Sequence, residues 1–266
     1  MRYADWVNGL AHGDLGCYYG TSGYTTASHC PDKVVDRVRD ALPISIQLMF
    51  YAQLLSIIIA VPMGVLTAYR AGSLFDKTAN TTAFALLAIP NFVLGLLLAY
   101  YVGTQLGWVD PTSYIDFGQD PVGHFQQLAL PVISLAVGQI AIYMRLLRSD
   151  MIQTLQEDFI TMAKAKGLTN RRILLRHALR PSSFSLLTVA ALNVGALIGG
   201  AVVIEAVFQL PGLGLKLVQA IQGRQYVALQ AYVAIIAVAY VGFNALVDIL
   251  YVVLDPRIRN VRALAR

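Results

Sequence analysis

Few residues in this chain have the types and spacing that catalysis or metal binding needs. The four histidines stand far apart and the sequence has no Cys-x-x-Cys pair, so the spacing of a zinc site is absent. The four are His12, His29, His124 and His177. The nucleotide-binding pattern Gly-x-x-x-x-Gly-Lys-Ser/Thr does not occur, and Gly212-Leu-Gly-Leu-Lys216, which resembles it loosely, follows an apolar run and is interpreted as a turn. We therefore predict no catalytic residues, no metal site and no bound cofactor, and the chain should not hydrolyse ATP itself.

The elements that would have to carry any function are long apolar helices. The 266 residues are 57% hydrophobic and 13% charged, with a mean hydropathy of +0.60, which is typical of a polytopic membrane protein. About 20 apolar residues cross a bilayer as a helix, and five segments qualify: 44–68, 79–106, 129–147, 184–204 and 228–254. Pro90 should kink the second, because proline removes one helical hydrogen bond.

The basic residues predict the orientation of these spans. The net charge of +5 does not indicate nucleic-acid binding, because the basic residues sit at the ends of apolar spans. Most of the 20 Lys and Arg fall in 69–78, 145–183 and the tail after 254, whereas 107–128 has none, so the former should face the cytoplasm. We predict an extracytoplasmic segment 1–40, a transmembrane domain 41–259 with a cytoplasmic coupling loop 148–183, and a cytoplasmic tail 260–266.

The amino-terminal segment leaves two questions open. An exported segment without a signal peptide is awkward, so we expect that a further transmembrane helix precedes it. Cys17 and Cys30 both lie in this segment, and their pairing in a disulfide is open.

The spans lack the side chains that drive transport on their own. Ionisable groups are absent from 79–106, 129–144, 184–204 and 228–247, although ion-coupled carriers place such groups at mid-membrane. A self-sufficient secondary transporter or channel is therefore the weaker alternative, and a membrane-embedded enzyme is weaker still. The polar candidates for a pathway, which equally suit helix packing, are Asn91, Gln139, Asn193 and Asn244. Glu205, at a helix end, is either a buried functional acid or a cap.

The segment 150–179 predicts a short helix, a turn at Gly167 and Thr169-Asn170, and a second helix that leads to Pro181, both helices along the membrane surface. Phe159, Ala163 and Lys166-Gly167 should share one face, with small residues beside an aromatic one. Such a face suits a docked protein partner, and the nearby basic residues equally suit acidic lipid headgroups.

This segment resembles the EAA loop of binding-protein-dependent ABC importer permeases. Three runs are similar to the form found in oligopeptide, dipeptide and nickel permeases. They are Asp158-Phe159-Ile160, Ala163-Lys164-Ala165-Lys166-Gly167-Leu168 and Arg176-His177-Ala178-Leu179-Arg180. Thr161-Met162-Ala163 replaces the Glu-Ala-Ala triplet of other members. The resemblance implies that the residues of 155–172 seat on a separate ATPase subunit, with Asp158, Phe159, Ala163, Lys166, Gly167 and Leu168 as contacts.

The resemblance covers nearly the whole chain. A family stretch at the outer end of the fifth helix is similar to the run from Gly199-Gly200 through Glu205 and Phe208 to Pro211-Gly212-Leu213-Gly214. The family's carboxyl ending is similar to Asp248–Arg259. Gly13-Asp14-Leu15-Gly16 resembles a segment of the subunit type with a large loop after its first helix.

The family implies an all-α transmembrane bundle of the type I ABC importer permease kind, with five spans here of an expected six, in the cytoplasmic membrane. It also implies a second permease subunit, ABC ATPase subunits, an extracytoplasmic solute-binding protein and surrounding membrane lipid as partners. Dipeptides, oligopeptides and nickel are the implied substrates.

Overall fold

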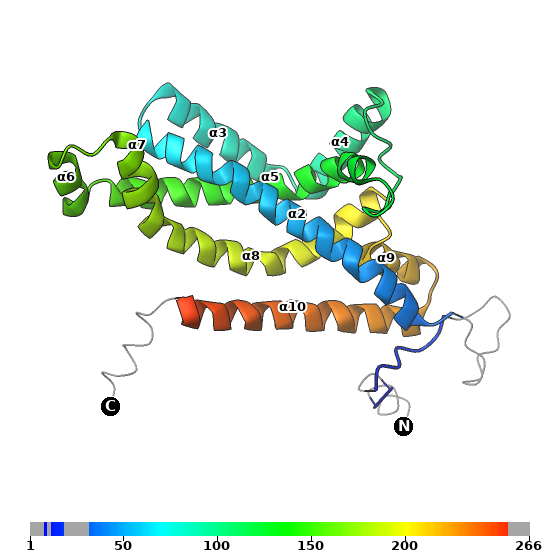
Figure 1. Ribbon diagram of the computed structural model, residues 1–266. Helices are drawn as coiled ribbons and strands as arrows, with labels where there is room; N and C mark the ends of the chain where they lie inside the picture. Colours follow the sequence, from blue (N-terminus) through cyan, green and yellow to red (C-terminus); the bar gives the residue numbers. More distant parts are fainter. Residues whose placement is uncertain (1–7, 10–11, 19–31, 255–266) are drawn as a thin grey trace, which may run out of the picture.

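The computed structural model describes residues 8–9, 12–18 and 32–254, and helices make up most of them (Figure 1). In chain order they are α2 (Val34–Tyr69), α3 (Leu74–Ala88), α4 (Asn91–Leu98), the π-helical η1 (Ala99–Gln105), α5 (Pro121–Thr154), α6 (Asp158–Ala165), α7 (Asn170–Arg172), the π-helical η2 (Ile173–Ala178), α8 (Leu179–Val207), α9 (Leu213–Gln222) and α10 (Tyr226–Leu254).

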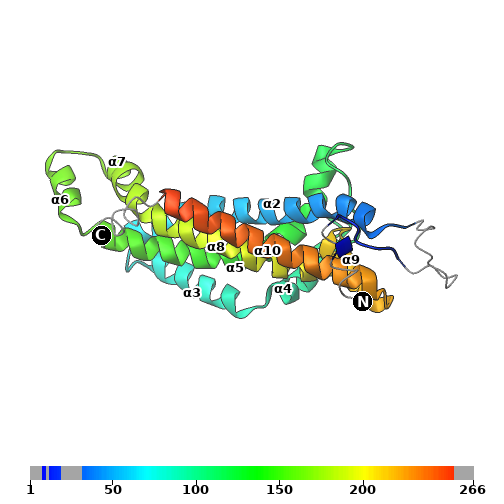
Figure 2. The same ribbon diagram turned by 90° about the horizontal axis from the view of Figure 1, so that it is seen from below.

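The helices form an elongated bundle whose two ends differ. Figures 1 and 2 show α2, α5, α8 and α10 running along its length, with α6 and α7 at one end and α4 and α9 at the other. The turn between α2 and α3 lies beside α7 (Figure 1). We call these the α6 end and the α9 end.

Hydropathy identified four of the five predicted spans, and the fifth depends on how a bent pair of helices is counted. Among the described residues, four helices are long and apolar enough to cross a membrane, and the α3–α4 pair makes a fifth if it is counted as one span. That pair is bent by 94° at the break before α4, so the expected kink at Pro90 is a sharp bend. Ile89 has an extended backbone and Pro90 directly precedes the first residue of α4, because a residue before proline avoids the helical region.

Two helices begin earlier than predicted. α2 starts at Val34 and not at 44, inside the segment 1–40, because Val34, Val38 and Ala41 are buried in a cluster with residues of α9 and α10. α5 starts at Pro121 and not at 129. The Asp120 side chain accepts a hydrogen bond of 3.0 Å from the N–H of Val122 and Pro121 fills the first helical position, a strong start signal for a helix.

Helices extend into both ends of the loop predicted at 148–183. α5 continues to Thr154, the helix resumes at Asn170, and α7, η2 and α8 form one span of 38 residues. The prediction of a second surface helix ending at Pro181 is therefore wrong. A proline ring clashes with the carbonyl four residues earlier, which is His177 here, and His177 lies in the π-helical η2, whose bonding differs from that of an α-helix.

The predicted tail 260–266 and Cys30 lie outside the described residues, so neither that boundary nor the pairing of Cys17 with Cys30 is tested.

Candidate coupling site

A short helix, α6, projects from the α6 end between two long helices. Its last turn is closed by a Schellman motif, in which the N–H of Leu168 donates to the carbonyl of Ala163 (3.3 Å) and the N–H of Gly167 donates to that of Lys164 (2.9 Å). Gly167 has a φ of +74°, the left-handed conformation that glycine adopts without strain. The predicted turn at Gly167 is thus confirmed, and it fixes where α6 stops.

The two faces of α6 differ in what they offer. Ile160 and Ala163 are buried against the chain's own α5 and η2, in a cluster that includes Met151 and Ile173. Ala163 therefore does not share an exposed face with Phe159, and that grouping was wrong. The small Ala163 side chain lets α6 lie close to its own bundle, because no long side chain separates them.

The exposed face of α6 is apolar and flanked by charges. Phe159 is 45% exposed and Met162 is 60% exposed. Asp158 at the start of α6 and Lys166 just after its end are also exposed, and Leu168 is half-buried. Met162 was missed from the sequence, because the pattern of an eight-residue helix does not say which side packs on the bundle. We call Phe159 and Met162 the α6 outer face.

The chain on both sides of α6 is anchored. Where α5 ends, the hydroxyl groups of Thr154 and Ser182 are 3.0 Å apart and hydrogen-bonded. At the start of α7, Nδ2 of Asn170 donates to the hydroxyl of Tyr69 at 3.4 Å. Ser182 belongs to α8 and Tyr69 to α2, so the chain around α6 is joined to three long helices.

A buried ion pair fixes α3 at the same end. Arg148 of α5 donates from Nε and Nη2 to the two carboxylate oxygens of Asp76, at 2.5 and 2.7 Å, and the Asp76 side chain is only 4% exposed. The N–H of Gly72 and Nδ2 of Asn80 also donate to this carboxylate. A bidentate pair with further hydrogen bonds is the strong form of such a contact, so α3 and the preceding turn are tied to α5.

Two of the four polar pathway candidates, Asn91 and Asn244, lie at contacts between helices. Oδ1 of Asn91 lies 3.2 Å from where a Cβ on Gly138 would stand, and Oδ1 of Asn244 lies 3.1 Å from that of Gly195. These two join α4 to α5 and α10 to α8. Gln139 is buried, and within the described ranges its Oε1 and Nδ2 of Asn193 have no hydrogen-bond partner.

Gln53 was missed from the sequence. Its Oε1 accepts a hydrogen bond of 3.2 Å from the Tyr143 hydroxyl, and its Nε2 donates to the carbonyl of Ala190 at 3.3 Å. It therefore links α2, α5 and α8 in the middle of the bundle, where a lone glutamine gave no signal of this role.

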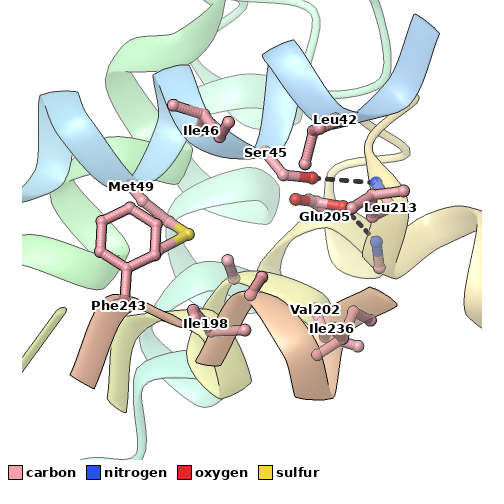
Figure 3. Close-up of a pocket in the computed structure, with 13 residues that line it drawn as sticks. Leu42, Ser45, Ile46, Met49, Ile198, Val202, Glu205, Leu213, Ile236 and Phe243 are labelled. Atoms are coloured by element: carbon pink, nitrogen blue, oxygen red, sulfur yellow. Dashed lines mark hydrogen bonds between the residues drawn. The ribbon is translucent and has the colours of Figure 1, made fainter. Parts of the chain in front are cut away.

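Glu205 is a cap at the α9 end, as one of the two interpretations expected. Its Oε2 accepts hydrogen bonds from the N–H groups of Gly214 (2.7 Å) and Leu215 (3.3 Å), while the Leu213 N–H donates to Oγ of Ser45 at 2.9 Å (Figure 3). Glu205 is 1% exposed. A carboxylate at a helix N-terminus accepts hydrogen bonds from the free N–H groups and interacts favourably with the helix dipole. Glu205 and Ser45 therefore hold α9 against α8 and α2.

The two glycines beside Glu205 are needed for this close approach. A Cβ at Gly214 would stand 2.4 Å from the Cα of Val202, and one at Gly212 would stand 2.3 Å from Oε2 of Glu205. The stretch from Glu205 to Gly214 is therefore a single structural unit, which explains why an acid and two glycines occur at this spacing.

Relatives of known type cover almost the whole chain. A putative peptide transport system permease protein of Brucella abortus is 35% identical over 259 residues, 97% of this chain and 80% of the relative. The oligopeptide transport system permease protein AppB of Bacillus subtilis is 35% identical over 261 residues, with the same coverage of 97% and 80%. The dipeptide transport system permease protein DppB of Escherichia coli is 33% identical over 287 residues, 98% of this chain and 81% of the relative.

Solved structures share the fold. The chain matches a chain of the MetNI methionine ABC transporter in an inward-facing conformation with a TM-score of 0.66 and 16% identity, covering 82% of this chain and 96% of the other. An amino acid ABC transporter matches with a TM-score of 0.60 and 17% identity, covering 81% and 93%.

The fold is therefore that of type I ABC importer permeases. Residues 60–260 match the model of the binding-protein-dependent transport system inner membrane component, and this chain belongs to that family of membrane permease subunits.

Proposed function

We propose that this chain is one permease subunit of an ATP-driven importer of peptides, and that its α6 outer face seats on a separate ATPase subunit. The observation that carries the proposal is the identity of 33% or more, over 97% or more of the chain, to permeases named for peptide or dipeptide transport.

Three features support α6 as the coupling contact. Phe159 and Met162 are large apolar side chains that the chain's own packing leaves exposed, and exposed apolar groups rimmed by charge favour protein contacts. Burial of Ile160 and Ala163 against the bundle fixes the direction of those two side chains. The anchors at Thr154 and Asn170 give a displaced α6 a rigid route into α5, α2 and α8.

The contact residues proposed from the sequence divide into two roles. Asp158, Phe159 and Lys166 are exposed, and we propose that they touch the ATPase together with Met162. Ala163, Gly167 and Leu168 act instead by holding α6 against the bundle.

The proposal also assigns directions and partners. The α6 end faces the cytoplasm, in accord with its basic residues, and the α9 end faces the solute-binding protein. A second permease subunit completes the pathway. Glu205 holds α9 rigid at the outer surface, so a binding protein would meet a fixed surface and not a mobile loop.

The direct test is uptake by the reconstituted transporter. The chain is assembled in vesicles with the permease, ATPase and binding protein encoded with it, and labelled di- and oligopeptides are offered with and without ATP. We expect accumulation that needs both ATP and the ATPase. Accumulation by this chain alone, without a nucleotide-hydrolysing subunit, would instead identify a secondary transporter or channel.

A further inference from the structure

A groove between α3 and α5 at the α6 end has the chemistry of a phospholipid site. It is open, and it is lined by Asn80 and Phe84 from α3 and by Ile142, Arg145, Leu146, Arg148 and Ser149 from α5. We propose that it binds the phosphate of an anionic phospholipid of the cytoplasmic leaflet.

Arg145 supplies an uncompensated positive charge to the groove. Its guanidinium carbon lies 3.7 Å from the centre of the Phe84 ring, and it forms no ion pair with any residue in the described ranges. Stacking on a ring occupies the flat face of a guanidinium and leaves the N–H donors at its edge free. Arg145 is thus held in position with its donors available.

Two further donors lie on the same face of α5. Arg148 and Ser149 follow Arg145 by three and four residues, the spacing that brings helical side chains together. Arg148 uses Nε and Nη2 to hold Asp76, which fixes its orientation and leaves Nη1 without a hydrogen-bond partner among the described residues. Ser149 is exposed. Two guanidinium groups and a hydroxyl group match the oxygens of a phosphate.

The groove is polar at one end and apolar at the other. Arg148 and Ser149 lie toward the end of α5 that leads to α6, whereas Ile142 lies about two helical turns nearer the bundle centre. On α3, Phe84 likewise lies one turn further from the α6 end than Asn80. Free phosphate would need only the polar end, whereas a lipid with its headgroup at the cytoplasmic surface uses both.

The site rests on the proposed orientation, but not on the transported solute or on ATP coupling. Its test therefore measures bound lipid and not transport. The assembled transporter is purified from vesicles of phosphatidylglycerol and phosphatidylcholine, and retained lipid is counted by mass spectrometry. We expect phosphatidylglycerol to be retained preferentially and Arg145→Gln to retain about fivefold less of it, since one basic residue near the membrane surface is worth about 1 kcal/mol.

Arg172→Gln is the matched control, because Arg172 is an exposed arginine of the same end that lies outside the groove. Equal loss in Arg172→Gln would mean that general surface charge holds the lipid, and unchanged retention in Arg145→Gln would also overturn the proposal. If Arg145→Gln loses the second permease subunit but retains as much phosphatidylglycerol as the wild type, the groove is a contact between subunits and not a lipid site.

If Arg145→Gln fails to assemble, Ser149→Ala tests the same site through an exposed side chain. The expected loss is about threefold, the value of one ordinary hydrogen bond, and no loss would refute the assignment.

Discussion

Replacing Gly167 separates the shape of α6 from what α6 touches. Gly167 has a φ of +74°, and a Cβ there would meet no described residue within 4 Å. In Gly167→Ala the cost is therefore purely conformational, about 1–2 kcal/mol for a residue with a Cβ in the left-handed region. Such a change shifts the balance between the closed and the unwound last turn of α6 by roughly 5- to 30-fold.

Asparagine and arginine at the same position are the informative comparisons. Gly167→Asn should lose less activity than Gly167→Ala, because asparagine tolerates the left-handed conformation better. Gly167→Arg should lose most and abolish coupling, since its side chain adds bulk and charge in space that the described residues leave open and the ATPase would fill.

The assay is ATP-dependent uptake of labelled peptide by reconstituted vesicles, with membrane insertion and co-purified ATPase measured alongside. We expect uptake to fall in the order wild type, Asn, Ala, Arg, with insertion unchanged. If uptake by Gly167→Ala equals that of the wild type, the motif that closes α6 does not matter. If uptake by Gly167→Arg equals that by Gly167→Ala, no partner occupies that space and the docking model is refuted.

Three further perturbations test other parts of the account. Glu205→Ala should destabilise the purified complex by about 1–3 kcal/mol for each N–H group of α9 left buried and unpaired, measured as a lower melting temperature, and an unchanged Tm would contradict the cap. Gly214→Ala should cost a similar 1–3 kcal/mol by overpacking against Val202, 2.4 Å from the new Cβ. Gly214→Ala should also make the α9 region more sensitive to proteolysis. A variant as resistant to protease as the wild type would refute this expectation. Asp76→Ala should lower the Tm more than the double variant Asp76→Ala/Arg148→Ala does, because the single change leaves a partly buried guanidinium group without its partner. A double variant with a lower Tm than Asp76→Ala would argue against the ion pair.

The long helices were predictable because the bilayer demands a run of apolar residues that hydropathy reveals directly. Their ends were less so. The start of α2 at Val34 depends on burial against α9 and α10, which are far away in sequence. The start of α5 at Pro121 was readable in principle, because Asp120-Pro121 is a local capping signal.

The candidate site was partly predictable. The turn at Gly167 follows from glycine chemistry, and the sequence pattern located α6. The inward direction of Ala163 and the outward direction of Met162 depend on how the eight-residue α6 packs on η2, and a single helix period cannot choose which of its two faces is covered. The partner of the Leu213 N–H group was likewise invisible, since Ser45 lies 168 residues from it in the sequence.

The central claim is that the α6 outer face touches the ATPase, and site-specific cross-linking tests it most directly. A photo-cross-linking amino acid replaces Met162, which is 60% exposed, and in a matched control it replaces Ile221 of α9, which is 55% exposed. In the assembled transporter we predict a cross-link from position 162 to the ATPase subunit and none from position 221. An assembled, active transporter in which position 162 cross-links only to lipid would contradict the account.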